Sequence, residues 1–315
     1  MTPHDIRLND VEYFTRGRPD DFNIAGFSGA RDGVLHDRPV VKAQVAEASG
    51  FRGITFMDHM VPPLAAGHPM HEAFVTATVV AMKTEHLRVG HLVLCDSFRQ
   101  PAVLAREALA LDHASEGRFD LGIGSGSVVS EFEPYGIPML AGPDRVRRLD
   151  ETLEVLRALW SGEPVSFDGD FHHLHSASMA PRPLDRIPIV IGGSGPATMA
   201  VVARHADWWN LPVHKLSRFE ELRSKAGSAR VSLQQMVAFI GSESERAEVT
   251  QLADKRFPNY GPGLLIANAD ELIAHFSGIA ERGVERFYVW FADFAADATL
   301  RMFGDRVVSA LAPGP

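Results

Sequence analysis

The chain has 315 residues, 45% of them hydrophobic and 23% charged, which is the composition of an ordinary globular protein. Its 40 acidic and 31 basic side chains give a net charge of −9, which argues against a general nucleic-acid binder because such proteins neutralise phosphates with basic groups. The single cysteine, Cys95, excludes a disulfide framework and a multi-thiolate zinc site. No apolar stretch approaches the roughly 20 residues of a membrane helix, and no signal-peptide core is present, so we expect a cytoplasmic protein without a membrane partner.

Strand-like and helix-like segments alternate along the chain. Short apolar runs predict eight strands, at residues 22–27, 53–57, 87–94, 119–123, 187–191, 208–213, 236–240 and 286–291. Helical sequence follows each run, at residues 39–49, 70–84, 101–114, 144–160, 196–205, 216–226, 270–282 and 296–311. Such alternation is typical of parallel strands joined by crossover helices, and eight units in this length favour a (β/α)8 TIM barrel over a doubly wound sheet.

The domain organisation follows from the same pattern. No shift in composition marks a boundary, so we expect residues 1–315 to form a single barrel domain with residues 1–21 as an N-terminal extension. The stretches 124–143, 162–186 and 256–267 are expected to be inserted loops. The first of them follows the fourth strand, so it and its neighbours on that rim would build the active site.

The second predicted strand ends in Met57, Asp58 and His59. A histidine just beyond the carboxyl end of a barrel strand lies over the barrel mouth, where it can transfer a proton near neutral pH. The alternative is a loop histidine paired with its own neighbour, Asp58. The position at the rim favours the catalytic interpretation.

Glycines follow two other strands. Residues 121–126 (LGIGSG) allow close approach to a ring or phosphate, but Ser127 stands where the Rossmann fingerprint needs its third glycine, and Gly-x-Ser-x-Gly is absent. Taken alone, this segment predicts only a tight turn. Residues 191–196 (IGGSGP) join a strand to a helix, and bare amides at a helix start bind anions, so they predict a phosphate site rather than a plain turn.

Other polar clusters are weaker candidates. The three histidines in residues 172–175 lack an accompanying carboxylate pattern, so we expect a solvated loop and no metal site. Cys95 has no acid–base partner that would mark it as a nucleophile.

Several segments occur together with these motifs. They are Asp58-His59, residues 87–94 (LRVGHLVL), 98–102 (FRQPA) and 111–126 (LDHASEGRFDLGIGSG), Glu131 with residues 135–138 (YGIP), and residues 151–160, 191–196 and 206–209 (ADWW). Over about residues 40–212 the chain thereby resembles the luciferase-like flavin-dependent oxidoreductases. Beyond that range, only the periodicity supports the barrel.

The resemblance implies a TIM-like barrel that binds either FMN or the deazaflavin coenzyme F420. It implies a non-prolyl cis peptide at Leu92-Val93, and it makes His59 the residue beside the reactive ring that donates or accepts a proton. The cofactor-binding residues implied in this way are Asp58, His59, Leu92 and Val93, the ring-side Gly124, Ser125 and Gly126, and Gly192, Gly193, Ser194, Gly195 and Pro196 at the phosphate tail.

Two departures from the family pattern concern the substrate. The sugar-phosphate dehydrogenases of the family carry Glu directly after the glycine loop, where this chain has Ser127, and a Trp shortly after the His, where it has Pro62, Pro63 and Leu64. These differences argue against a sugar phosphate and remove the family's acid partner. The loops instead indicate a less charged organic substrate.

The resulting hypothesis is an oxidoreductase that moves a hydride between F420 and a small organic substrate while His59 moves a proton. The alternative is a two-component FMN-dependent monooxygenase that uses O2 and reduced flavin from a separate reductase. A metal-dependent barrel hydrolase and a non-catalytic flavin-binding protein are further alternatives. The resemblance also implies a homodimer, and a flavin or F420 reductase as a partner.

Overall fold

The computed structural model describes residues 21–27, 38–62, 70–258 and 260–312. In this part of the chain eight parallel strands close into a barrel, because β1 pairs with β2 on one side and with β12 on the other. In barrel order the strands are β1 (Asp21–Phe27), β2 (Gly53–Phe56), β3 (Arg88–His91), β5 (Phe119–Gly124), β8 (Ile189–Gly192), β9 (Trp208–Pro212), β10 (Arg230–Phe239) and β12 (Arg286–Phe291). They fall on the eight apolar runs of the sequence, so the predicted (β/α)8 TIM barrel is confirmed.

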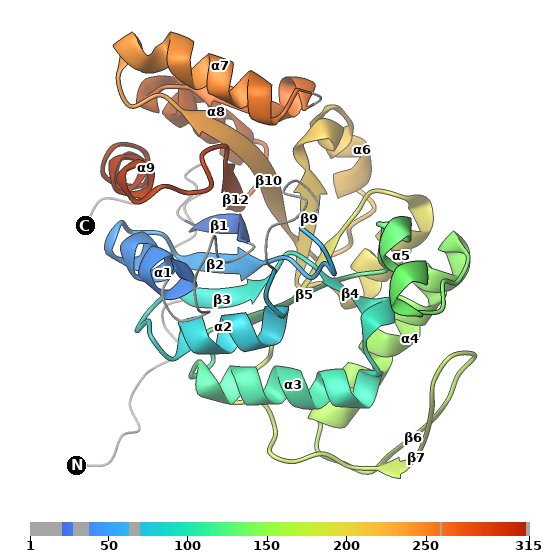
Figure 1. The fold of residues 1–315 in the computed structure, drawn as a ribbon. Coiled ribbons are helices and arrows are strands. Elements are labelled where there is room, and N and C mark those ends of the chain that lie inside the picture. The colour runs from blue at the N-terminus through green and yellow to red at the C-terminus, as the bar shows by residue number, and fades with distance from the viewer. Residues whose placement is uncertain (1–20, 28–37, 63–69, 259, 313–315) are drawn as a thin grey trace, which may run out of the picture.

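Helices cover the outside of this barrel (Figure 1). They are α1 (Arg38–Ala48), α2 (Ala73–Ala81), α3 (Pro101–Ala114), α4 (Gly142–Trp160), α5 (Pro196–His205), α6 (Phe219–Arg223), α7 (Arg246–Arg256), α8 (Ala269–Glu281), α9 (Asp297–Phe303) and α10 (Ser309–Leu311). Helices α1 to α5 pack successively against one another around one side of the barrel. The crossover helices therefore leave the carboxyl ends of the strands at one rim.

Local signals set where several helices begin. Pro101 occupies the first turn of α3, where its missing N–H breaks no hydrogen bond, and the Gln100 side chain caps the same turn. Asn268 and Glu271 form a reciprocal capping box at the start of α8. The helix predicted to start at residue 144 begins two residues earlier, at Gly142. Asp144 lies inside the first turn, where its charge still favours the positive end of the helix dipole.

The core has an inner and an outer part. Most buried apolar side chains lie in one large cluster between the strands and the surrounding helices. Val190 of β8, Trp208 of β9, Tyr288 of β12 and Leu92, which follows β3, form a separate cluster. Because strands such as β5 are buried on both faces, their sequences are continuous apolar runs.

Three strands lie where the sequence predicts loops. The stretch 162–186 contains the antiparallel hairpin β6 (Val165–Asp168) and β7 (His173–Ala177), and 256–267 contains β11 (Leu264–Ala267). The hairpin alternates exposed residues with partly buried ones and adds only Leu174 to the buried core, so it lacks an apolar run. Strand β11 pairs only with the carboxyl end of β10 and is not a member of the closed barrel.

The helix predicted at 216–226 also differs, since a 3-10 segment at Val213–Arg218 precedes the short α6. Helix α7 was not expected from the sequence, and Ala253 is its one buried residue among those described. Because α7 presents almost no apolar face, periodicity could not reveal it. The predicted extension 1–21 lies outside the described residues except for Asp21, which begins β1. None of the helices in the described ranges has the length and apolar character to cross a membrane.

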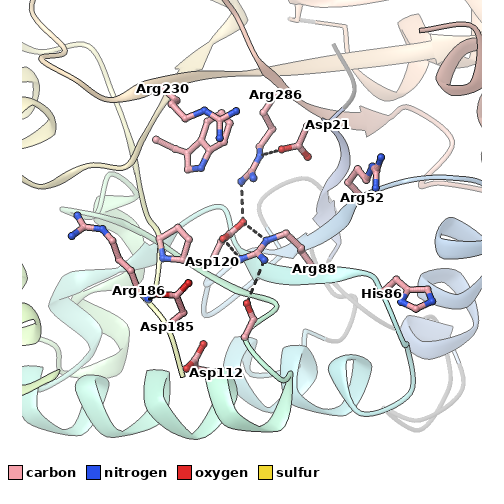
Figure 2. Close-up of a pocket in the computed structure, with 13 residues that line it drawn as sticks. Asp21, Arg52, His86, Arg88, Asp112, Asp120, Asp185, Arg186, Arg230 and Arg286 are labelled. Atoms are coloured by element: carbon pink, nitrogen blue, oxygen red, sulfur yellow. Dashed lines mark hydrogen bonds and ion pairs between the residues drawn. The ribbon is translucent and has the colours of Figure 1, made fainter. Parts of the chain in front are cut away.

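Charged side chains join opposite sides of the barrel at the amino ends of its strands. Arg286 of β12 pairs with Asp21 of β1, and its Nη1 donates to Asp120 Oδ2 of β5 at 2.9 Å. Arg88 of β3 donates to the other oxygen of Asp120 at 2.6 Å. Figure 2 shows this ion network at the wall of a cavity of about 520 Å³. Residues at this end of a TIM barrel generally serve stability, and the network ties the first and last strands together.

A buried histidine, His91, predicts acid-sensitive stability. The centre of its ring lies 4.6 Å from that of Phe74 and 5.6 Å from that of Phe119. Neither ring nitrogen has a hydrogen-bond partner of normal geometry among the described residues. The backbone of Ala73 acts to raise the pKa of His91, but other effects are larger. Burial, assisted by the charge of Arg99, lowers the pKa of His91 from 6.5 to about 3. Between these values the unfolded chain binds a proton that the folded chain does not, so stability falls as the pH falls.

We expect His91→Leu to remove this dependence. At pH 5, protonation of the unfolded histidine alone costs about 2 kcal/mol of folding free energy, which the leucine variant would not lose. Denaturant unfolding of both proteins at pH 7 and pH 5 measures the difference. The exposed His86 provides the control variant, His86→Leu, which should follow the unmodified protein. Parallel loss of stability in the His91→Leu variant and the unmodified protein would contradict the prediction.

Candidate functional site

The residues predicted to bind a cofactor gather at the carboxyl ends of adjacent strands. Asp58 and His59 follow β2, Leu92-Val93 follows β3, Gly124 ends β5 and Gly192 ends β8. Because β2, β3, β5 and β8 are consecutive neighbours in the sheet, these segments share one stretch of the barrel rim. This is the edge at which TIM-barrel enzymes carry their active sites.

His59 is paired with a carboxylate from another loop. Its Nδ1 lies 2.9 Å from Glu131 Oε2, and the second carboxylate oxygen accepts the backbone N–H of Met60 at 3.0 Å and of Val61 at 3.3 Å. A carboxylate that accepts these hydrogen bonds requires Nδ1 of His59 to be the donor. In the neutral imidazole Nε2 is then the unprotonated nitrogen, and within the described chain it has no hydrogen-bond partner. With 23% of its side chain exposed, His59 can reach a bound molecule.

The sequence did not predict this pairing. Glu131 appears there only as part of the family resemblance, and the absence of Glu at position 127 implied that His59 lacks an acid partner. That inference is wrong, because Glu131 supplies the carboxylate four residues later. Two short 3-10 segments, Val129–Glu131 and Glu133–Tyr135, shape the loop so that the Glu131 side chain turns inward and is buried.

Asp58 makes protein contacts with both carboxylate oxygens. Its Oδ2 accepts the Cys95 N–H at 2.9 Å and pairs with Arg99 Nη1, while Oδ1 accepts Arg99 Nη2 at 3.0 Å. The cofactor-binding role implied for Asp58 remains a prediction. The contacts present link the end of β2 to the segment after β3.

The bond between Leu92 and Val93 is a non-prolyl cis peptide, as the resemblance implied. Strand β5 passes very close to this segment. A Cβ at Gly122 would lie 1.7 Å from the carbonyl oxygen of His91, so only glycine fits there. The glycines of β5 thus serve strand packing, beside any contact that Gly124 makes with a cofactor.

Gly126 has a left-handed backbone with φ of +80°, and a Cβ there would lie 2.8 Å from Cys95 Sγ. Ser125 and Gly126 therefore form the turn that the sequence predicts at the end of β5. Burial raises the pKa of the Cys95 thiol to about 12, which keeps it protonated and unreactive at neutral pH.

The second glycine segment leads directly into α5. Gly195 is the N-cap residue, Pro196 begins the helix, and no side chain caps its first turn. The Trp209 indole donates to the Gly193 carbonyl at 2.9 Å, and Gly193 has φ of +133°, which few other residues adopt. The arrangement leaves backbone amides and the positive helix end available to an anion at the rim.

One group of potential metal ligands lies elsewhere. Ligand atoms of Asp150, Glu154 and His205 are within 4.8 Å of one another between α4 and α5. Arg204 and His205 already pair with Asp150, which gives this carboxylate its charge partners. Of the histidines at 172–175, His172 is buried and contacts Thr152 Oγ1 at 2.9 Å, so it is not the solvated loop residue we expected.

The chain was compared with protein-family models and with curated proteins, and the matches agree on one family. The model of the family described as luciferase-like monooxygenase matches residues 37–296. An F420-dependent glucose-6-phosphate dehydrogenase of Microbacterium testaceum is 32% identical over 164 residues, which are 52% of this chain and 48% of that protein. An FMNH2-dependent dimethylsulfone monooxygenase of Pseudomonas fluorescens is 29% identical over 225 residues, 69% of this chain and 61% of that protein. The match thus spans about half the length of the F420-dependent relatives.

Solved structures share the fold at lower identity. An F420-dependent secondary alcohol dehydrogenase in complex with an F420-acetone adduct superposes with a TM-score of 0.74 at 19% identity, covering 94% of this chain and all of that one. A long-chain alkane monooxygenase gives a TM-score of 0.76 at 16% identity, covering 94% and 91%. Both an F420-dependent dehydrogenase and a monooxygenase therefore share this barrel.

Proposed function

The chain belongs to the luciferase-like monooxygenase family, and from this we propose that it transfers a hydride between coenzyme F420 and a small organic substrate. The observation that carries the proposal is the His59–Glu131 pair at the rim, in which Nε2 of the histidine has no partner among the described residues. F420-dependent dehydrogenases among the relatives support this choice of cofactor.

The residues at the rim fit such a cofactor. The uncapped start of α5, with Gly193, Ser194 and Gly195 before it, would hold a phosphate through backbone amides. Leu92, Val93 and Gly124 would provide an apolar surface and close backbone approach for a flat ring. When bound, F420 would supply a carbon that accepts or releases a hydride.

His59 would handle the proton that accompanies the hydride. If an alcohol is oxidised, its hydroxyl proton passes to His59 Nε2 as the hydride leaves the adjacent carbon, and reduction of a carbonyl reverses both movements. Nδ1 keeps its proton in the hydrogen bond to Glu131, and the carboxylate stabilises the imidazolium that forms. Glu131 thus sets which nitrogen of His59 can act.

The rim beside His59 favours a substrate of low charge. Five large apolar side chains are exposed on the two loops that Glu131 joins, namely Met60, Val61, Val129, Tyr135 and Met139. Apolar side chains of this kind would contact an alkyl or aryl group rather than a phosphate. This supports the substrate class expected from the sequence.

An FMN-dependent monooxygenase is the second candidate. It is favoured by one observation, the longer match to the FMNH2-dependent relative, which extends over 69% of this chain. In that case a separate reductase would deliver the reduced flavin.

Titration of the purified protein with F420 and with FMN separates the two candidates. We expect F420 to bind more tightly, and its absorbance to change on addition of small alcohols or of the corresponding carbonyl compounds. Tighter binding of reduced FMN, with O2 consumption and no F420 turnover, would favour the monooxygenase. Binding of either cofactor without hydride transfer would identify a flavin-binding protein.

We also propose a homodimer that buries the outer face of α1, α2 and α3. Val41, Val75 and Val103 are exposed on these three successive helices, and the exposed Met82 directly follows α2. Exposed apolar side chains gathered on neighbouring elements are typical of interfaces. We expect Met82→Glu combined with Val103→Glu to yield monomers in light scattering, whereas the exposed Leu184→Glu elsewhere should leave the mass unchanged. A monomeric unmodified protein would contradict this proposal.

A further inference from the structure

Arg99 binds the carboxylate that directly precedes His59. Both of its terminal nitrogens contact Asp58, and Nη2 also pairs with Glu72 Oε1 at 2.7 Å. The side chains of Arg99 and Asp58 are only 12% and 10% exposed. A two-point contact of this kind fixes direction as well as charge.

Both the backbone and the side chain of Arg99 are held by residues from other elements. Arg148 of α4 donates to the Arg99 carbonyl at 2.9 Å and pairs with Asp96, which holds the backbone that carries Arg99. Glu107 of α3 lies 3.6 Å from Arg99 Nε. Burial would lower the pKa of Arg99, but Asp58 and Glu72 outweigh it and raise that pKa, so the side chain stays charged.

These contacts extend to the backbone on both sides of His59. Asp58 is held by Arg99 and by the Cys95 N–H, while Glu131 holds the N–H groups of Met60 and Val61. The imidazole is therefore placed between two fixed points. Loss of the Arg99–Asp58 contact would free the backbone at Asp58, although Glu131 would still contact the His59 ring.

Charge provides a second link. The described charged groups linked to this segment are Glu131 on the His59 ring, Asp58 as the preceding residue, and Arg99 with its other partners Glu72 and Glu107. Without Arg99, the poorly solvated Asp58 carboxylate would favour the protonated imidazole. The protonated form of His59 cannot accept a proton, so a larger protonated fraction would slow the oxidation of an alcohol.

We propose that Arg99 is a positioning residue for His59, acting through Asp58 to fix its backbone and to neutralise the carboxylate that directly precedes it. The catalytic consequence rests on the proposed function. The effect on the imidazole does not, because it is a property of the protein without cofactor or substrate.

The test is an NMR titration of the imidazole in the cofactor-free full chain, with the His59 signal assigned by its loss in His59→Ala. In Arg99→Met we expect the titration midpoint to move upward by roughly half a pH unit to one unit. Asp58→Asn, which leaves the arginine in place, should move it downward. The double variant should lie near the unmodified protein, and Arg99→Lys should restore most of the midpoint. Arg147→Met, an exposed arginine on α4, is the control and should change nothing.

Unchanged midpoints in both Arg99→Met and Asp58→Asn, with intact circular dichroism, would overturn the proposal. If Arg99→Met does not fold, the downward shift in Asp58→Asn still decides the matter. For the reaction, kcat of Arg99→Met should fall more than KM rises. Shifted midpoints in a protein that shows no F420 turnover would retain the positioning role and reject the proposed function.

Discussion

Turnover is expected to fall by roughly two to four orders of magnitude when His59 is replaced by alanine, because proton transfer by a positioned side chain contributes about that much to a reaction rate. Affinity for the cofactor should change little, since the predicted phosphate contacts lie at the start of α5. Steady-state rates with F420, together with a binding titration, measure the two quantities separately. Unchanged turnover would exclude the proton role of His59.

Glu131→Gln is the matched variant for the same mechanism. The glutamine can still accept the Met60 and Val61 N–H groups through its carbonyl oxygen, so the loop contact is retained. Its NH2 group would then face Nδ1 and favour the tautomer with the proton on Nε2, which cannot accept another. We expect alcohol oxidation to slow markedly while the unfolding midpoint stays close to that of the unmodified protein.

The sequence predicts the barrel well because of how its strands are buried. A strand such as β5, covered on the inside by other strands and on the outside by helices, must be apolar almost throughout. Elements outside this arrangement carry no such signal. The β6–β7 hairpin covers little core. Strand β11 pairs only with the carboxyl end of the ten-residue β10.

The site was predictable where it follows directly from strand ends, and not where it depends on loop shape. His59 and the glycine segments lie immediately after strands, so the topology places them at one rim. The pairing of His59 with Glu131 joins residues 72 positions apart through two irregular loops. No spacing rule connects them, and only the folded path of residues 127–135 brings the carboxylate inward.

The largest stability effect is expected from Arg286→Met at the amino end of the barrel. The guanidinium is almost fully buried and shared between Asp21 and Asp120, so its removal leaves two carboxylates without their common partner. Breaking a buried ion pair by removing one member typically costs about 3–5 kcal/mol. Chemical denaturation of the variant at pH 7 should show a loss of this size.

The acid dependence provides a second signature of the same network. Burial tends to raise the pKa of Asp120, but the charges of Arg88 and Arg286 outweigh it and hold that pKa below the ordinary value of 3.8. Because the pKa of Asp120 is lower in the folded than in the unfolded chain, its ionised carboxylate stabilises the fold at pH values above the unfolded pKa. This stabilisation is lost as the pH falls through the folded pKa. Without Arg286 the stabilisation should shrink, so the variant should unfold at higher pH than the unmodified protein. Arg52 is an exposed arginine that lines the same cavity (Figure 2), so Arg52→Met should neither lower the stability at pH 7 nor raise the pH of acid unfolding. An equal loss of stability in the Arg286→Met and Arg52→Met variants would refute the barrel-closing role of Arg286.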